Sequence, residues 1–290
     1  MPISPRRLSP LVLLCLAATW LIWGSTYLAI RFALRSFPPF QQMGTRFVIA
    51  GGLLLVWMRW RGAPWPSRLQ WRNALVIGSL LLVTGMGATA YAEQTVPSGL
   101  IVTFVAILPA LISLFNLFAG IRPGRLELAG IAVGFAGVLL LTRGAAFSTS
   151  PAGLAAISLA SCSWALGSVL SQRVFPLAAG AMGYGSEMLA GGVVLLLLSL
   201  LWGEPLHWPP QPLALGAWLY LIVFGSLLAF NAYMYLLGAA SPAVASSYAF
   251  VNPVIALLLG IALGNETVTS GEWLAAVVIL AGVVLLLRGR

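Results

Sequence analysis

The stretch 126–144, LELAGIAVGFAGVLLLTRG, recurs as stretch 271–289, GEWLAAVVILAGVVLLLRG, at an offset of 145 residues. Nine of the 19 aligned positions are identical, including a Glu near the start, an Ala-Gly-Val in the middle and an Arg-Gly at the end. Both copies are almost uninterrupted apolar runs, as a membrane-spanning helix requires. The repeat predicts two homologous halves, which we place at residues 1–145 and 146–290.

The composition places the whole chain in a membrane. Of its 290 residues 60% are hydrophobic and 7% are charged, whereas a soluble domain has about 25% charged residues. The charged residues are 15 Arg and 6 Glu, without Lys or Asp. A soluble enzyme and a disordered chain are therefore excluded. We also expect no nucleic-acid partner, because the Arg residues are spread along the chain instead of forming a basic face.

Apolar runs between clusters of Arg, Glu, Pro and Gly predict ten transmembrane helices. Their approximate ranges are 11–30, 40–58, 73–91, 97–119, 127–142, 152–171, 182–202, 213–236, 242–263 and 271–287. We interpret the first run as an uncleaved helix because it continues past the small residues Ala17 and Ala18. The predicted fold class is an all-α integral membrane protein with short loops and no extramembrane domain.

The distribution of Arg predicts the orientation of these helices. Ten spans put both termini on one side, and the positive-inside rule assigns the Arg-rich side to the cytoplasm. That side carries eleven Arg: Arg6, Arg7, Arg59, Arg61, Arg68, Arg72, Arg122, Arg125, Arg173, Arg288 and Arg290. The other side carries four: Arg31, Arg35, Arg46 and Arg143. We therefore predict a bacterial-type inner-membrane protein with cytoplasmic N- and C-termini, and we expect Arg31 and Arg46 to extend their charged ends to the outer interface.

Five spans in each half force the second half into the membrane upside down relative to the first. Charge supports this inversion, because the connection 119–127 carries Arg122 and Arg125 whereas its counterpart 264–272 carries Glu266 and Glu272. Inverted repeats are typical of carriers that hold their substrate near the bilayer midplane, between the halves. The sequence thus predicts a central cavity and alternating access.

The sequence offers no set of catalytic or metal-binding residues. There is no Asp, and the single His, His207, lies in the predicted loop 204–209. A zinc site needs several His, Cys or carboxylate ligands, and a Ser–His hydrolase needs an oriented imidazole. We predict that the protein is not an enzyme and has neither a cofactor nor a bound metal.

Aromatic and amide side chains at helical spacing are the candidate binding residues. On the first predicted helix Trp20, Trp23 and Tyr27 recur three and four residues apart and so share one face. Such stripes most often serve helix packing, since buried Trp, Tyr and Asn need hydrogen-bond partners. The alternative is an aromatic-walled cavity suited to an amphipathic solute. The predicted substrate-binding residues are Trp20, Tyr27, Trp164, Ser168, Asn231, Tyr235, Tyr248 and Asn252.

Two prolines and two glutamates are the predicted gating residues. Pro109 and Pro253 lie in the middle of the fourth and ninth predicted helices, where a proline frees a backbone carbonyl and permits bending. Glu93 and Glu187 fall near the ends of the third and seventh spans, where either an interfacial position or a gating role fits. No carboxylate falls plainly at a helix centre, so no proton or sodium site is predicted.

Residues 235–287 carry Ser241-Pro242-Ala243, Asn252-Pro253, Gly264-Asn265-Glu266 and Gly271-Glu272, and the stretch resembles the EamA domain of the drug/metabolite transporter superfamily. The first half resembles the same domain at Trp23-Gly24-Ser25, Pro109 and Gly137. It departs from the domain at residues 121–124, where the family has a Gly-Glu pair. The resemblance implies ten helices in two inverted halves, cytoplasmic termini and a cavity among helices 1, 3, 4, 6, 8 and 9. The aromatic stripes are similar to those of aromatic amino acid exporters of this superfamily.

The predicted function is secondary export of amino acids, aromatic or amphipathic ones above all, and of related metabolites. One alternative is an exporter of drugs or quaternary amines, for which a central Glu would be expected. Another is a membrane-embedded enzyme or a lipid flippase. The predicted partners are a small-molecule substrate and the lipid bilayer, and the predicted state is a monomer.

Overall fold

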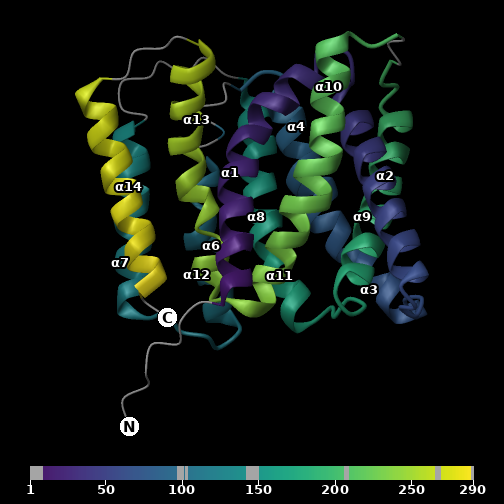
Figure 1. Ribbon diagram of the computed structural model, residues 1–290, viewed down its shortest axis with the longest axis horizontal. Coiled ribbons are helices and arrows are strands. Elements are labelled where there is room, and N and C mark those ends of the chain that lie inside the picture. The colour runs from purple at the N-terminus through teal and green to yellow at the C-terminus, as the bar shows by residue number, and fades with distance from the viewer. Residues whose placement is uncertain are drawn as a thin grey trace.

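A computed structural model describes residues 9–96, 101, 104–141, 150–205, 209–264 and 269–288. Over these residues the regular structure is entirely helical, and the long helices stand side by side in one bundle (Figure 1). Of the residues named above, Arg6, Arg7, Arg143, His207, Asn265, Glu266 and Arg290 lie outside the described residues. The predicted all-α membrane fold is confirmed.

The helices follow the predicted spans closely. Those of the first half are α1 (Pro10–Ala33), α2 (Pro39–Trp60), α3 (Arg68–Gly78), the π-helical segment η1 (Ser79–Gly87), α4 (Ala88–Ala92), α6 (Leu108–Phe118) and α7 (Arg125–Leu141). Those of the second half are α8 (Pro151–Arg173), α9 (Ala181–Leu201), α10 (Pro212–Tyr220), the π-helical segment η2 (Leu221–Phe230), α11 (Asn231–Ala239), α12 (Pro242–Ala245), α13 (Tyr248–Gly264) and α14 (Ser270–Arg288).

Within the described parts of the chain, seven helical stretches are long and apolar enough to cross a membrane. They are Pro10–Ala33, Arg68–Ala92, Pro151–Arg173, Ala181–Leu201, Pro212–Ala239, Pro242–Leu259 and Ser270–Arg288. Together with α2, α6 and α7 they correspond to the ten predicted spans. The third, eighth and ninth spans each contain more than one element, because a π-helical segment or a turn interrupts the α-helix.

Serine–proline pairs start equivalent helices in the two halves. Ser9 Oγ accepts the backbone N–H of Val12 at 3.2 Å at the start of α1, and Ser150 Oγ accepts that of Gly153 at 3.0 Å at the start of α8. In both helices a proline follows the serine, at a position whose N–H needs no intrahelical partner. The same local signal therefore starts the first helix of each half.

The two halves are inverted with respect to each other. The first turn of α1 and the last turn of α14 lie at the same face of the bundle, the lower face in Figure 1. Five spans separate the start of α1 from the start of α8, so α8 crosses the bundle in the direction opposite to α1. We call the face where α1 begins the Arg-rich face, because the loops beside α3 and α7 carry most of the described arginines there.

Glycines let α7 and α14 cross in close, reciprocal contact. A Cβ atom on Gly137 would lie 2.8 Å from the backbone nitrogen of Ile279, and one on Gly282 would lie 2.5 Å from that of Gly134. Adding 145 to Gly137 and Gly134 gives Gly282 and Ile279, so each contact is the copy of the other. Small residues at such a crossing bring membrane helices together by direct backbone packing.

The α2–α9 crossing has the same reciprocal form. A Cβ on Gly51 would lie 2.7 Å from the carbonyl oxygen of Gly185, and one on Gly192 would lie 3.0 Å from that of Gly44. Here the residues of the two halves correspond at an offset of 141, since Gly44 maps onto Gly185 and Gly51 onto Gly192. A two-fold axis between the halves therefore passes through this crossing.

The two prolines predicted to act in gating differ in their positions. The prediction that Pro109 lies in the middle of a continuous helix is wrong, because a turn at residues 106–107 ends the preceding helical segment and Pro109 lies in the first turn of α6. A proline is tolerated there because the first N–H groups of a helix have no intrahelical acceptor. Pro253 does lie inside a helix, α13, which follows a similar turn at residues 246–247.

Candidate functional site

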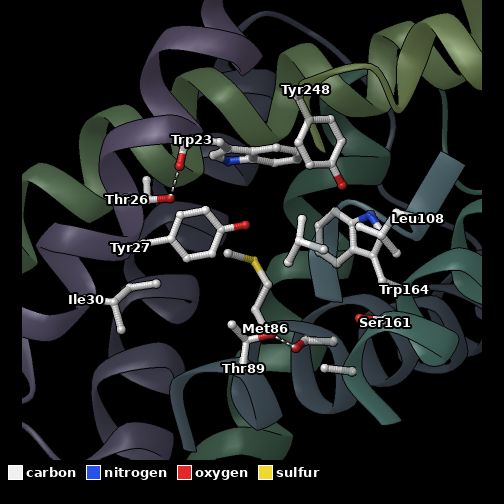
Figure 2. Close-up of a pocket in the computed structure, with 13 residues that line it drawn as sticks. Trp23, Thr26, Tyr27, Ile30, Met86, Thr89, Leu108, Ser161, Trp164 and Tyr248 are labelled. Carbon is white, nitrogen blue, oxygen red and sulfur yellow. Dashed lines mark hydrogen bonds between the residues drawn. The ribbon is translucent and has the colours of Figure 1, made fainter. Parts of the chain in front are cut away.

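A cavity opens between the two halves, close to the middle of the bundle. It holds about 540 Å³ of empty space, part of it open to solvent. Its wall is contributed by α1, η1, α4, α6, α8 and α13, with Val105 before α6. Figure 2 shows the aromatic rings of Trp23, Tyr27, Trp164 and Tyr248 around this space.

An aromatic cluster of Trp23, Trp164, Tyr233 and Tyr248 forms the deep end of the cavity. The ring of Trp23 lies 4.6 Å from that of Tyr248 and 5.6 Å from that of Trp164. Tyr233 packs 5.3 Å from Trp164 and 5.5 Å from Tyr248. Edge-to-face and tilted pairs at these distances are favourable beyond simple burial. The cluster joins α1 of the first half to α8, α11 and α13 of the second.

Hydrogen bonds fix the orientation of this cluster. Trp164 Nε1 donates to the Tyr233 hydroxyl at 3.1 Å, and that hydroxyl lies 2.6 Å from Ser168 Oγ. Ser168 Oγ itself donates to the carbonyl oxygen of Trp164 at 2.7 Å. Because a hydroxyl has one hydrogen, Tyr233 must donate to Ser168. The Tyr233 hydroxyl is thus satisfied on both sides and holds the indole of Trp164 in place.

The bundle is closed between the aromatic cluster and the Arg-rich face. The first turns of α1, with Val12 and Leu16, pack against α11 and α12 through Leu236 and Val244, and all four side chains are buried. The cavity instead reaches toward the opposite face, where Ile30 and Thr89 lie near the ends of α1 and α4. Over the described residues, the cavity is thus closed toward the Arg-rich face and extends toward the opposite one.

A carboxyl group and a guanidinium lie at the open end. Glu93 follows α4 directly, and burial raises the pKa of its carboxyl well above the usual range, while the nearby Arg31 lowers it in part. Its Oε1 atom is buried without a hydrogen-bond partner among the described residues. Glu93 also lies close enough to Tyr27 to influence it electrostatically. This places Glu93 beside the entrance to the cavity.

Of the eight predicted binding residues, three line the cavity. They are Tyr27, Trp164 and Tyr248, and Figure 2 shows all three facing the same space. Ser168 lies one turn after Trp164 in α8, and its hydroxyl bonds to the Tyr233 hydroxyl and to the carbonyl oxygen of Trp164. These four residues come from α1, α8 and α13, so the structure brings together side chains that are far apart in the sequence.

Three other predicted binding residues lie away from the cavity wall. Trp20 Nε1 donates to Ser247 Oγ at 3.0 Å, at the turn before α13. Asn231 Nδ2 donates to the carbonyl oxygens of Ser226 and Leu227 at 3.2 and 3.0 Å, just after η2. Tyr235 is half-buried and packs with the residues that close the Arg-rich face. Each of these residues is engaged in packing or local hydrogen bonding in this state.

The eighth predicted residue, Asn252, is fully buried behind Tyr27. Neither its Oδ1 nor its Nδ2 has a hydrogen-bond partner among the described residues, although the amide lies near the Tyr27 hydroxyl. An unpaired buried amide is costly and rare in folded proteins, so it marks a position where something besides packing is selected. Asn252 precedes Pro253, which leaves this part of α13 with fewer backbone donors.

Sequence reasoning missed two central residues, Trp23 and Tyr233. Trp23 had a signal, because it belongs to the stripe with Trp20 and Tyr27. Tyr233 lies between Asn231 and Tyr235 in the sequence and points to the opposite side of α11. Since the spacing singles out Asn231 and Tyr235 in α11, it gives no signal for Tyr233 between them.

Two charged side chains are fully buried, which the sequence analysis did not expect. Arg46 has 0% of its surface exposed, so the expectation that it reaches the outer interface is wrong. Glu187 is also 0% exposed, and neither carboxyl oxygen has a hydrogen-bond partner among the described residues. Glu187 lies about two turns into α9, as its place in the sequence indicated, and it is buried inside the bundle. Over the described chain, no three His, Cys or Glu side chains come close enough to hold a metal ion.

Comparison with known proteins identifies the family. The chain matches the EamA-like transporter family over residues 10–143 and again over residues 151–288. It is 46% identical to an uncharacterized inner membrane transporter, YedA, of Escherichia coli (strain K12), over 98% of this chain and 93% of that protein. It is 27% identical to protein PecM of Dickeya dadantii, over 91% of this chain and 88% of the relative.

The fold is also found in a crystal structure that covers 94% of this chain and 95% of its own, with a TM-score of 0.76 and 23% sequence identity. The double match to the family agrees with the two sets of helices described above, and the relatives named here are of similar length. The chain is a multi-pass inner-membrane protein that belongs to the EamA-like transporter family of the drug/metabolite transporter superfamily.

Proposed function

We propose that this transporter exports amino acids, aromatic or amphipathic ones above all, by alternating access without a cofactor. The observation that carries the proposal is the cavity between the halves, which is walled by Trp23, Tyr27, Trp164 and Tyr248 and closed toward the Arg-rich face. A solute in this cavity faces one side of the membrane and is separated from the other by the aromatic cluster and the packed ends of α1 and α11.

The lining of the cavity favours a solute that is part apolar and part polar. Four aromatic rings offer faces and edges for stacking, each such contact being worth about 0.5–1.5 kcal/mol. Hydroxyl groups of Thr26, Thr89 and Ser161 stand among them and supply hydrogen-bonding positions. An aromatic amino acid combines these two requirements better than a sugar or an inorganic ion does.

The inverted repeat supplies the second state. We infer that residues 1–145 and 146–290 move against each other, so that each half adopts the conformation now seen in the other. In the present state α1 packs against α11 and α12 below the cavity. Opening toward the Arg-rich face requires the separation of Val12 and Leu16 from Leu236 and Val244, whereas the α2–α9 and α7–α14 crossings lie on the two-fold axis and can persist.

The arginines support an orientation for this cycle. Eight described residues lie in or beside the loops of the Arg-rich face: Arg59, Arg61, Arg68, Arg72, Arg122, Arg125, Arg173 and Arg288. Only Arg31 and Arg35 lie at the opposite end among the described residues. By the positive-inside rule the Arg-rich face is cytoplasmic, and both termini with it. The described conformation is then the outward-facing state of a monomeric exporter.

Exchange in liposomes tests the proposal. Purified protein in liposomes loaded with unlabelled L-phenylalanine is expected to accumulate labelled L-phenylalanine from outside, and cells that overproduce it are expected to resist 4-fluorophenylalanine. Trp164→Ala is expected to lower the exchange at least severalfold, because it removes an aromatic wall and a partner of Tyr233. Absence of exchange with every amino acid tried would overturn the proposal.

A second candidate function has one observation in its favour. Export of drugs or quaternary amines calls for a buried carboxylate, and Glu187 is such a group. Labelled tetraphenylphosphonium in place of phenylalanine tests this candidate in the same liposomes. Uptake of the cation that is lost in Glu187→Gln, without any exchange of amino acids, would replace the first proposal by the second.

A further inference from the structure

Arg46 is the only described arginine with no exposed surface, and its surroundings are unusual for a charged group. Its Nε donates to Ser226 Oγ at 2.7 Å. Its Nη1 and Nη2 atoms face the sulfur atoms of Met43 at 3.4 Å and of Met86 at 4.0 Å, and the guanidinium stacks over the ring of Phe47 at 4.7 Å. Thioether sulfur is a weak acceptor, so four of its five N–H donors lack a strong partner.

No described carboxylate neutralises this charge. The chain has six Glu and no Asp, and the five described Glu form no ion pair with Arg46. Glu204 accepts the backbone N–H groups of Phe40 and Gln41, and Glu272 bonds to Thr269. Both oxygens of Glu187 lack partners. An unpaired charge in the membrane interior is strongly unfavourable and marks a functional site by default.

The two-fold axis places Arg46 close to the middle of the molecule. The offset of 141 found at the α2–α9 crossing aligns GTRFVIAG (44–51) with GSEMLAGG (185–192), and it maps Arg46 onto Glu187. Arg46 lies one and a half residues from the centre of the Gly44–Gly51 segment, or about 2 Å along the helix axis. The two halves therefore carry opposite buried charges at equivalent positions near the midplane.

These two charges face different neighbours. Arg46 points toward η2, where Ser226 and Gly225 lie, and Glu187 lies on the side of α9 that faces Tyr233. A Cβ atom on Gly225 would be 3.3 Å from Arg46 Nη2 and 3.5 Å from Thr26 Cγ2. Since Thr26 lines the cavity, the guanidinium lies directly behind the cavity wall.

Met86 covers the guanidinium on its cavity side. It lines the cavity while its sulfur lies 4.0 Å from Arg46 Nη2, and Figure 2 shows that sulfur pointing into the space near Tyr27. A methionine side chain is unbranched and changes rotamer easily. A shift of this one side chain would expose the unpaired N–H groups to a solute in the cavity.

We propose that Arg46 is the receptor for a carboxylate group of the cargo, which it binds when the Met86 side chain moves aside. The proposal rests on the proposed function and narrows its substrate class to carboxylates, zwitterionic amino acids included. A carboxylate accepts two parallel hydrogen bonds from a guanidinium and supplies the missing negative charge. Esters, amides and amines of the same carbon skeleton lack the negative charge and the pair of equivalent acceptor oxygens.

Competition in the exchange assay tests this site. Uptake of labelled L-phenylalanine by the wild type is expected to be inhibited by L-phenylalanine and by 3-phenylpropionate at concentrations about tenfold lower than by L-phenylalaninamide or phenethylamine, as suits a charge-assisted pair. Arg46→Gln is expected to raise the half-saturating concentration of phenylalanine about tenfold and to abolish the difference between acid and amide. Arg46→Lys is expected to retain part of it.

Arg35→Gln is the matched control, because it removes an exposed Arg at the end of α1, outside the cavity. It is expected to behave as the wild type does. If the wild type exchanges the acid and the amide equally well, or Arg46→Gln keeps the preference for the acid, the carboxylate site is overturned while the proposed function stands.

Thermal unfolding of the purified protein separates the two proposals. 3-Phenylpropionate is expected to raise the unfolding midpoint of the wild type, whereas phenethylamine is expected to leave it unchanged. Neither compound is expected to raise the midpoint of Arg46→Gln. If the midpoint shift depends on Arg46 but the protein exchanges no amino acid, the anion site is supported and the proposed function is overturned.

If Arg46→Gln does not fold, Met86→Ala is used, which keeps the guanidinium and removes the side chain that covers it. It is expected to lower the half-saturating concentration of phenylalanine but not of its amide, and an unchanged value would overturn the site.

Discussion

Tyr233 holds the floor of the cavity together through one hydroxyl group. That hydroxyl accepts from Trp164 Nε1 at 3.1 Å and donates to Ser168 Oγ, and all three residues are buried. Without it the indole N–H of Trp164 would be left without an acceptor in a region that excludes water. At the scale of single residues, the orientation of the cavity wall thus depends on an atom that does not itself line the cavity.

Tyr233→Phe is expected to lower the free energy of unfolding by about 1–3 kcal/mol, the cost of an unsatisfied buried donor, and to slow phenylalanine exchange. Thermal unfolding in detergent and exchange in liposomes measure the two effects. Tyr235→Phe is the control, because that half-buried tyrosine has no hydrogen bond from its hydroxyl among the described residues. Equal behaviour of the two variants would show that the hydrogen bonds of Tyr233 are unimportant.

Replacing Asn252 is expected to affect stability in the opposite direction to Tyr233→Phe. Because both polar atoms of this buried amide are unpaired, Asn252→Leu is expected to leave the unfolding midpoint unchanged or to raise it, while phenylalanine exchange falls. Asn116→Leu is the control, since Asn116 Nδ2 donates to the carbonyl oxygen of Ile112 at 2.9 Å and its loss is expected to destabilise the fold. If Asn252→Leu exchanges phenylalanine as fast as the wild type does, Asn252 has no role in transport beyond packing.

Among the helices, α2 and α9 cross in close backbone contact on the two-fold axis. Gly51 faces backbone atoms of α9 on one side of α2, and its neighbour Gly52 faces open space. Two adjacent glycines in one helix therefore have different roles. A side chain at the first meets backbone, which cannot move aside, and a side chain at the second meets nothing within 4 Å.

Gly51→Leu is expected to separate α2 from α9 and to lower the free energy of unfolding by about 1–3 kcal/mol or more, as overpacking does. Gly52→Leu in the same turn is expected to be close to neutral. Chemical unfolding of both variants, with the yield of folded protein after purification, checks the difference. The close crossing would be refuted by a Gly51→Leu protein as stable as the Gly52→Leu protein.

At the scale of the whole molecule, one end of the bundle is packed and the other is open. In a variant without Cys15 and Cys162, both of which are free thiols, a membrane-impermeant maleimide added outside whole cells is expected to label Thr89→Cys but not Leu236→Cys. Arg61→Cys is expected to react only after permeabilisation. Labelling of Arg61→Cys in intact cells would reverse the proposed orientation, and labelling of Leu236→Cys would contradict the closed end.

The sequence predicts this architecture well because its main signals are local. Apolar runs of helical length mark the spans, and the copies at 126–144 and 271–289 reveal the repeat that the α7–α14 crossing displays. The site is harder to predict, because its partners are distant in the sequence. Arg46 meets Ser226 from 180 residues away, and no spacing in α2 reveals that encounter. Tyr233 lies between Asn231 and Tyr235 in α11, and its partners Trp164 and Ser168 are at least 65 residues away in the sequence.

The α2–α9 crossing has a consequence for how the two halves recognise each other. At this crossing the first half contacts the second half through equivalent residues of each, as two identical subunits do in an isologous interface. Two copies of the first half could meet in the same way, but they would bring two guanidinium groups to the midplane, and two copies of the second half would bring two carboxyl groups. Only the pairing of unlike halves places one Arg46 and one Glu187 there, so the buried charges favour the association of each half with its sister over association with a copy of itself.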